Sequence, residues 1–169
     1  MPRPPIFHYI SLMKAATIQE IKQELVTVKP AILTGLCLRL ARFKKENKEL
    51  LTYLLFEAHD EEGYVRSVKK EIDEQFAEIN LSHLYYAKKS LRKIVRIINK
   101  YCRYSDSKET EIELRLHFCT TVKESGIPIH RNKLISNLYQ SQLKKMKTTI
   151  RLLHEDLQYD YEKSLEELD

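Results

Sequence analysis

The chain has 169 residues, 31% of them charged and 43% hydrophobic, and a formal net charge of +5. This length allows a hydrophobic core without cross-links, and the composition excludes extended disorder. The sequence holds only three glycines and five prolines and no Asn-Gly or Asp-Gly pair, so it lacks the turns that a β-rich fold requires. It therefore predicts an all-α fold with no β-sheet.

The first twelve residues differ from the rest of the chain, and Met13 opens an alternative start. Residues 1–12 are therefore either absent from the native protein or an N-terminal arm whose apolar side chains pack on the body. They lack the apolar stretch of a signal peptide, and no run reaches the roughly 20 apolar residues of a membrane span. These features predict a cytoplasmic protein with no membrane segment.

Three short helices are predicted after this segment. Thr17 and Glu20 match a capping box, and the helix that they open ends before Pro30. Pro30 suits the first turn of a second helix, which extends to about residue 43. Asn47 is placed to cap a third helix that ends near residue 58, and one uninterrupted helix over 31–58 is the alternative.

Longer helices follow in the second half. The apolar spacing predicts helices over about 64–79 and 82–104, and then one that begins at Ser107 and ends at Gly126 in a left-handed conformation. From Asn132 the apolar spacing alternates as in a coiled coil. This predicts a long helix 132–157, with a possible extension to Leu168, that packs against another helix of the chain or of a second copy.

We therefore expect about seven helices in a single domain over 1–169, packed as an antiparallel bundle or an irregular two-layer array. A weak similarity between 45–63 and 108–126 leaves open two stacked three-helix units, 17–63 and 64–126. The apolar faces predict these core residues: Leu40, Leu54, Ile94, Ile98, Leu116 and Ile150.

No motif for catalysis, cofactor binding or metal binding is present. The glycines are too far apart to cradle a phosphate, and the histidines and cysteines lack metal-ligand spacing. Glu113 and His117 lie one helical turn apart, which is only a weak signal for a metal. Cys37, Cys102 and Cys119 lie in apolar helical contexts and are predicted to be reduced and structural. We expect that the protein binds no cofactor and is not an enzyme.

The strongest local signal is the helix over 82–104. At 100° per residue its seven cations fall within an arc of about 140°, opposite an apolar arc. Such a face suits a nucleic-acid backbone or an acidic protein surface, or is simply solvated. The candidate site residues are Lys88, Lys89, Arg92, Lys93, Arg96, Lys100 and Arg103, with Tyr85 beside them as a stacking platform.

The C-terminal segment 155–169 has the opposite charge. It holds seven acidic residues and one lysine, a net charge of −6, so the remaining residues carry +11. This segment is either solvated or lies across the basic helix and competes with an external polyanion. The sequence favours a non-catalytic helical module that binds a protein partner or associates with itself through the helix 132–157; the alternative is nucleic-acid binding by the basic face.

Overall fold

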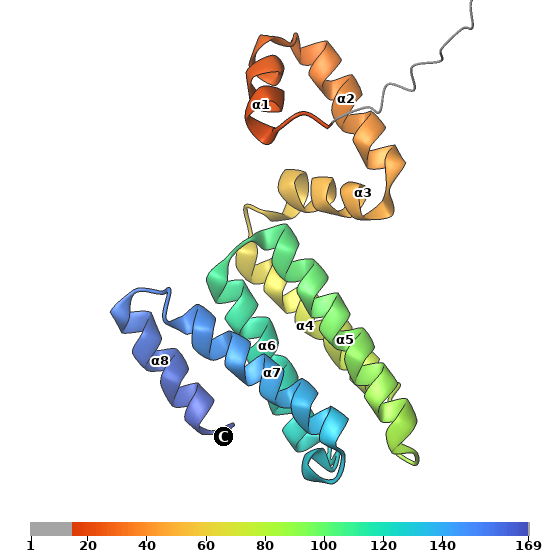
Figure 1. The fold of residues 1–169 in the computed structure, drawn as a ribbon, viewed down its shortest axis with the longest axis vertical. Coiled ribbons are helices and arrows are strands. Elements are labelled where there is room, and N and C mark those ends of the chain that lie inside the picture. The colour runs from red at the N-terminus through yellow and green to blue at the C-terminus, as the bar shows by residue number, and fades with distance from the viewer. Residues whose placement is uncertain (1–14, 169) are drawn as a thin grey trace, which may run out of the picture. The chain divides into compact units, whose positions relative to one another are not determined.

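Figure 1 shows the computed structural model, which describes residues 15–168. Over these residues it contains eight α-helices, a π-helical turn and a 3-10 turn, and no strand, which confirms the all-α prediction. The chain divides into two units, residues 1–48 and 49–169, and each is described by itself. The single domain over 1–169 stays a prediction, and the proposed arm over 1–12 lies outside the described residues.

The first unit contains α1 (Ile18–Thr27), α2 (Pro30–Phe43) and the start of α3 (Lys45–Thr52). The capping box is confirmed: Thr17 Oγ1 accepts from the backbone N–H of Glu20, and the Glu20 carboxylate accepts from the Thr17 N–H at 2.7 Å. Pro30 is confirmed in the first turn of α2. Asn47 does not cap α3, since its amide donates to the carbonyl of Leu40 near the end of α2.

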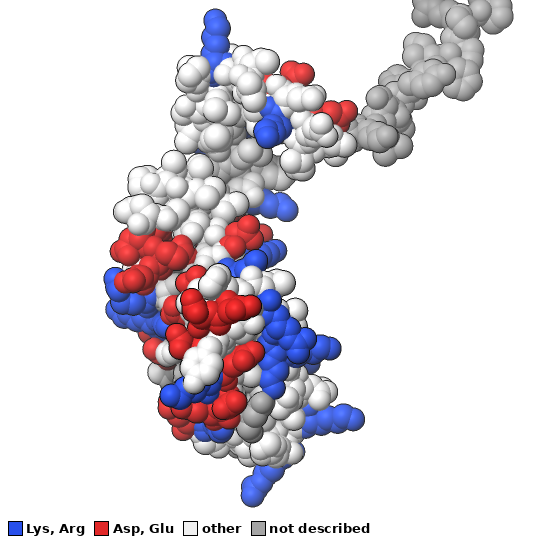
Figure 2. All heavy atoms as spheres, turned by 90° about the vertical axis from the view of Figure 1, so that its left-hand side faces the viewer, with Lys and Arg blue, Asp and Glu red and all other residues white. Residues whose placement is uncertain are grey.

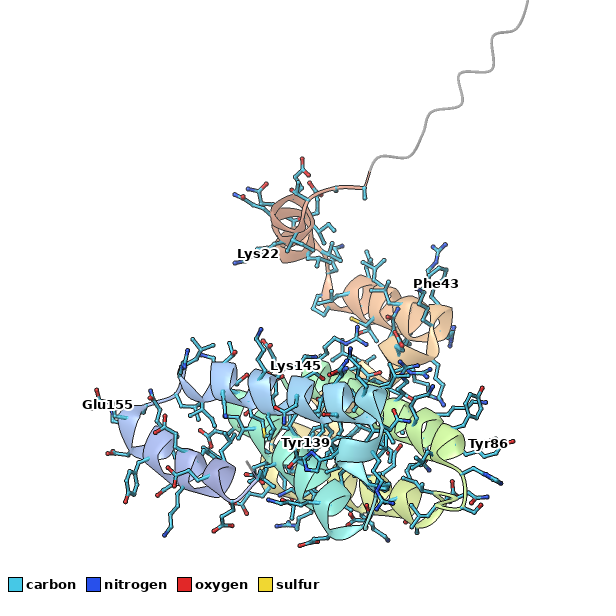
Figure 3. All side chains as sticks on the ribbon, turned by 60° about the horizontal axis from the view of Figure 1, so that its bottom comes forward. Lys22, Phe43, Tyr86, Tyr139, Lys145 and Glu155 are labelled. Carbon is cyan, nitrogen blue, oxygen red and sulfur yellow. The ribbon has the colours of Figure 1, made fainter. Side chains whose placement is uncertain are left out.

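None of the described residues before 49 is buried. The prediction of Leu40 as a core residue is therefore wrong: it is 60% exposed, and no described residue of α1 or α2 forms a core around it. Phe43 at the end of α2 is 76% exposed, and Figure 3 shows it projecting away from its helix. Local hydrogen bonds rather than a core define these helices.

The second unit holds the core. The π-helical turn η1 (Tyr53–Glu57) leads into five helices: α4 (Glu61–Ala77), α5 (Leu84–Ser105), α6 (Lys108–Glu124), α7 (Lys133–Ile150) and α8 (Glu155–Glu166), with the 3-10 turn η2 (Ile129–Arg131) before α7. Successive helices run antiparallel (Figure 1), as the short loops predict. α6 packs on α4, α5 and α7, and α8 packs on α7.

The predicted core residues of this unit are mostly correct. Ile94, Ile98 and Ile150 are buried, and Leu116 is half-buried against the core. Leu54 is 56% exposed, so that prediction is wrong. A π-helical turn has more residues per turn than an α-helix. η1 therefore changes which side chains of this segment face the core, and Tyr53 is buried in place of Leu54.

Several helix ends follow the sequence signals. Ser107 caps α6 and Asn132 caps α7 through their side-chain oxygens, and Gly126 takes the left-handed conformation after α6, with φ of 71°. α4 begins earlier than predicted because Asp60 caps it. α5 begins at Leu84, after His83, and the His83 side chain makes no capping hydrogen bond.

The predicted long closing helix is wrong. α7 ends at Ile150, and after a turn α8 begins at Glu155. The heptad-like stripe of α7 is buried within the chain, where it packs mainly on α6, so it is not free for self-association. The stripe consists of Ile135, Tyr139, Leu143, Met146 and Ile150. Figure 3 shows Tyr139 lying between the helices of this unit.

The proposed internal repeat has no structural counterpart. A unit boundary at 63/64 would fall inside α4, whose first turn contains Gly63. Gly126, which the repeat would equate with Gly63, lies beyond the end of α6. Residues 45–63 span α3, η1 and the start of α4, whereas 108–126 form one helix and its terminator, so the similarity reflects only amphipathic composition.

One polar cluster lies inside the helical layers of this unit. The Arg115 guanidinium is 4% exposed and binds the Glu111 carboxylate at 2.6 Å. It also donates to Oε1 of Gln142 on α7 and, at 3.0 Å, to Oδ1 of Asn99 on α5. One side chain of α6 thereby fixes the positions of its two neighbours, and its charge is compensated by hydrogen bonds and an ion pair.

We predict that Arg115→Ala lowers the free energy of unfolding by about 3 kcal/mol, because it leaves the buried amide of Gln142 without its donor and opens a space between three helices. Urea denaturation followed by circular dichroism measures this. Arg66→Ala is the matched control, since Arg66 forms the same one-turn pair with Glu62 but on the surface. Arg66→Ala should lower the free energy of unfolding by less than about 1 kcal/mol. Equal decreases for the two variants would contradict the role of the buried cluster.

Candidate functional site

All eight candidate residues lie on α5, whose apolar side faces the core. Tyr85 and five of the seven cations are exposed: Lys89, Arg92, Lys93, Arg96 and Arg103. These five cations form no ion pair within the part of the chain that the structure describes. We name these five the α5 basic face. The charge separation predicted for this helix is thus present at the surface of the protein.

Lys100 does not contribute to this face as predicted. It is half-buried, and its ammonium pairs with the Glu49 carboxylate at 3.1 Å. It also lies over the ring of Tyr101, 4.5 Å from the centroid. Its charge is compensated within the chain, because α3 brings an acid to the C-terminal half of α5.

The N-terminal end of α5 adds aromatic side chains to the basic face. Tyr85 is 64% exposed, and the half-buried Lys88 places its ammonium 5.2 Å from the centre of that ring. Tyr86 packs edge-on against Tyr85 and extends outward at the end of the unit, as Figure 3 shows. Tyr86 is a second exposed ring that the sequence argument did not include.

α7 supplies further exposed cations that the periodicity of α5 does not predict. Lys144 and Lys145 are exposed, and α7 contacts α5. Lys145 lies close enough to α5 for its charge to act on the thiol of Cys102. Helical periodicity on α5 alone cannot reveal this neighbour, because the contact depends on how the two helices pack.

The acidic C-terminal segment does not lie across α5. α8 packs on α7, with Leu165 and Leu168 buried. Lys123 of α6 donates to the Glu167 carbonyl at 2.7 Å, and the Tyr139 hydroxyl donates to that of Leu168 at 3.0 Å. The described acids of this segment are exposed, and Figure 2 shows acidic groups on the face where α8 lies. The competing arrangement is therefore not found in residues 155–168.

A second exposed surface is apolar. Five large side chains of α2 share an arc of about 100° and are between 38% and 76% exposed. These residues, which we name the α2 apolar face, are Ile32, Leu33, Leu36, Leu40 and Phe43. On α1, Ile18 and Val26 are 81% and 79% exposed. A contiguous apolar surface of this kind is typical of an interaction site.

The described residues offer no set of His, Cys, Asp or Glu side chains that could hold a metal ion. Glu113 and His117 do not act together: Glu113 pairs with Lys69 at 2.7 Å, and His117 contacts Asp73 at 2.6 Å. Both partners belong to α4, so these contacts join two helices. None of the described helices is long and apolar enough to cross a membrane.

The three cysteines are free thiols. Cys119 is buried, and burial raises its pKa to about 12. Cys102 is half-buried, and burial raises its pKa to about 11. Such thiols are poor nucleophiles at neutral pH. Cys37 is half-buried on α2, in the unit whose described residues lack a core.

A cleft of about 400 Å³ lies between α4 and α6. At one end the Glu61 carboxylate accepts hydrogen bonds from Tyr53, Ser105 and Thr110. Burial alone would raise the pKa of Glu61, but these three hydrogen bonds outweigh it and hold the pKa below its usual value. An ionised carboxylate held in this way is suited to fixing α4 against α5 and α6 rather than to accepting a proton.

Comparisons with protein-family models, curated proteins and solved structures gave no match to this chain.

The Glu61 contacts predict a pH dependence of stability. Because the folded pKa lies below the ordinary value of 4.5, the ionised carboxylate stabilises the fold above that pH, and this contribution is lost as the pH falls through the folded pKa. Glu61→Gln should lower the free energy of unfolding at pH 7 by about 1–2 kcal/mol and flatten its acid dependence. Urea denaturation at a series of pH values measures both. Glu62→Gln, which changes an exposed neighbour, should alter neither; parallel curves for the two variants would contradict the assignment.

Proposed function

We propose that the protein is a non-catalytic interaction module whose α2 apolar face docks onto an apolar surface of a partner protein. The observation that carries the proposal is the absence of any buried residue in α1 and α2, combined with five exposed large apolar side chains on one side of α2. Side chains of this size stabilise a complex when they are removed from water.

The lengths of these helices support the same proposal. α1 has 10 residues and α2 has 14. Helices of this length are marginal in water without tertiary packing, since their own hydrogen bonds barely offset nucleation. A partner surface that covers the α2 apolar face would supply the missing packing. This is the helix-in-groove mode of recognition, with anchors spaced three and four residues apart.

A second candidate function is nucleic-acid binding, and the exposed α5 basic face favours it. The five cations extend over 15 residues of one helix, from Lys89 to Arg103, or about 21 Å at the α-helical rise. Exposed Tyr85 and Tyr86 at one end would add stacking to the phosphate contacts, as in single-strand binding proteins. Lys144 and Lys145 of α7 would extend the positive potential.

Two double variants separate these functions. Leu40→Ser with Phe43→Ser should weaken partner binding by about 30-fold or more, since interface anchors contribute about 2 kcal/mol or more. Arg39→Ser, on the same helix and also exposed, is the matched control. The partner is captured from nuclease-treated extract, and its affinity for the full chain is then measured with both purified. Equal affinity of the double variant and the wild type would contradict docking through α2.

The second variant tests the nucleic-acid alternative. Arg92→Glu with Arg96→Glu removes charge from the α5 basic face at little cost in stability, because both side chains are exposed. If the alternative holds, wild type binds single-stranded RNA or duplex DNA with an affinity that falls steeply with salt, and this variant does not bind. A wild-type protein that binds neither at low ionic strength excludes the alternative and leaves docking through α2 as the function to be tested.

A further inference from the structure

A cavity of about 180 Å³ in the second unit is walled by tyrosine rings. Its lining residues come from the end of α3, from η1, from the start of α4 and from the end of α5. The residues that line it are Tyr53, Tyr64, Tyr101 and Tyr104, which we name the tyrosine cavity, together with Glu49, Thr52 and Glu57. None of these residues belongs to the α5 basic face or to the α2 apolar face.

The four rings meet at steep angles. The rings of Tyr64 and Tyr101 are 6.1 Å apart at 81°, and those of Tyr101 and Tyr104 are 6.0 Å apart at 82°. Tyr53 and Tyr64 are closer, at 4.6 Å and 54°. Aromatic cages that bind alkylammonium groups are likewise built from rings at steep angles to one another.

Each of the four hydroxyls already donates a hydrogen bond within the chain. Tyr53 donates to Glu61, Tyr64 to the Tyr101 carbonyl, Tyr101 to Glu71 and Tyr104 to Glu49. These bonds fix the orientation of the rings and engage the polar end of each one. What the rings offer to the cavity is then mainly their π surface, which attracts positive charge.

The charge of the lining has one sign. Glu49 and Glu57 contribute carboxylates, and none of the residues that line the cavity carries a positive charge. Lys100, which pairs with Glu49 at 3.1 Å, places its ammonium over the Tyr101 ring. The chain therefore already uses cation–π contact with one ring of this set. Because Lys100 neutralises Glu49, the net negative charge of the lining comes from Glu57, and this charge disfavours an anion.

The backbone gives an independent reason to expect binding at this place. Tyr53 and Glu57 belong to η1, the π-helical turn, and Thr52 precedes it directly. Single π-helical turns within helices are rare and are frequent at functional sites. In this chain η1 turns Tyr53 into the cavity and places the half-buried Glu57 on its lining.

We infer that the tyrosine cavity binds a quaternary alkylammonium group, the chemistry shared by choline compounds and trimethylated lysine. The volume corresponds to about six water molecules, which is room for a trimethylammonium group and the start of its chain, and it is below the size of pockets for drug-sized ligands. The rings would surround the cation, and the Glu57 carboxylate would balance its charge.

The test is an NMR titration of the full chain with choline, with acetylated trimethyllysine amide, and with 3,3-dimethylbutanol, the neutral analogue of choline. We expect saturable shifts of the Tyr101 and Tyr104 ring signals with a cationic probe, with a dissociation constant on the order of 1 mM, and none with the alcohol. Tighter binding of choline indicates a small molecule or lipid headgroup as the source, and tighter binding of trimethyllysine indicates a modified protein.

Two pairs of variants locate the site. Tyr101→Leu should weaken binding about tenfold through the loss of one cation–π contact, whereas Tyr86→Leu, at an exposed tyrosine outside the cavity, should not. Glu57→Gln keeps the ring packing and should weaken binding about threefold, and Glu74→Gln, an exposed acid of α4, serves as its control. The inference is overturned if neither cation gives saturable shifts, or if the neutral alcohol binds as tightly as the cations. Both outcomes are measured on the unmodified chain, so they do not depend on whether Tyr101→Leu folds.

Discussion

The second unit depends on one buried charge. Arg115 lies in the middle of α6, and its guanidinium reaches α5 through Asn99 and α7 through Gln142 while it pairs with Glu111 on its own helix. Such a group is costly to bury unless its donors find acceptors, so the register that pairs Arg115 with Asn99 and Gln142 is favoured over registers that leave it unpaired. Large apolar side chains on all three helices, including Ile94, Phe118 and Leu143, then fill the surrounding space.

Two surface features of the second unit follow from this arrangement. Packing α5 through one side onto α4, α6 and α7 leaves its opposite side to water, and the five cations of the α5 basic face occupy that side. The same packing brings the C-terminal end of α5 against the start of α4, where the rings of the tyrosine cavity meet. In the first unit, the α2 apolar face is exposed among the residues that the structure describes.

Local signals in the sequence were sufficient for much of the fold. The capping residues Thr17, Ser107 and Asn132 act through contacts within three residues, so each could be predicted from its neighbours alone. The orientation of α5 followed from periodicity. The break after Ile150 could not be predicted in this way, since the turn before α8 contains neither glycine nor proline.

Features that depend on contacts between distant residues were missed. Leu54 was assigned to the core because an α-helical period was assumed across η1, and the π-helical turn changes that phase. The charge of Lys100 is compensated by Glu49, 51 residues earlier. The tyrosine cavity joins Tyr64 to Tyr101 and Tyr104 across two helices, and no spacing in the sequence marks which faces of those helices meet.

Burial in the second unit holds that unit together, whereas α1 and α2 have no buried residue. Native-state hydrogen exchange of the isolated protein measures the consequence for stability. We expect amides of α4 to α7 to exchange only through global unfolding, and amides of α1 and α2 to exchange far faster through local opening. Protection of α1 and α2 equal to that of α6 in the isolated protein would contradict this expectation.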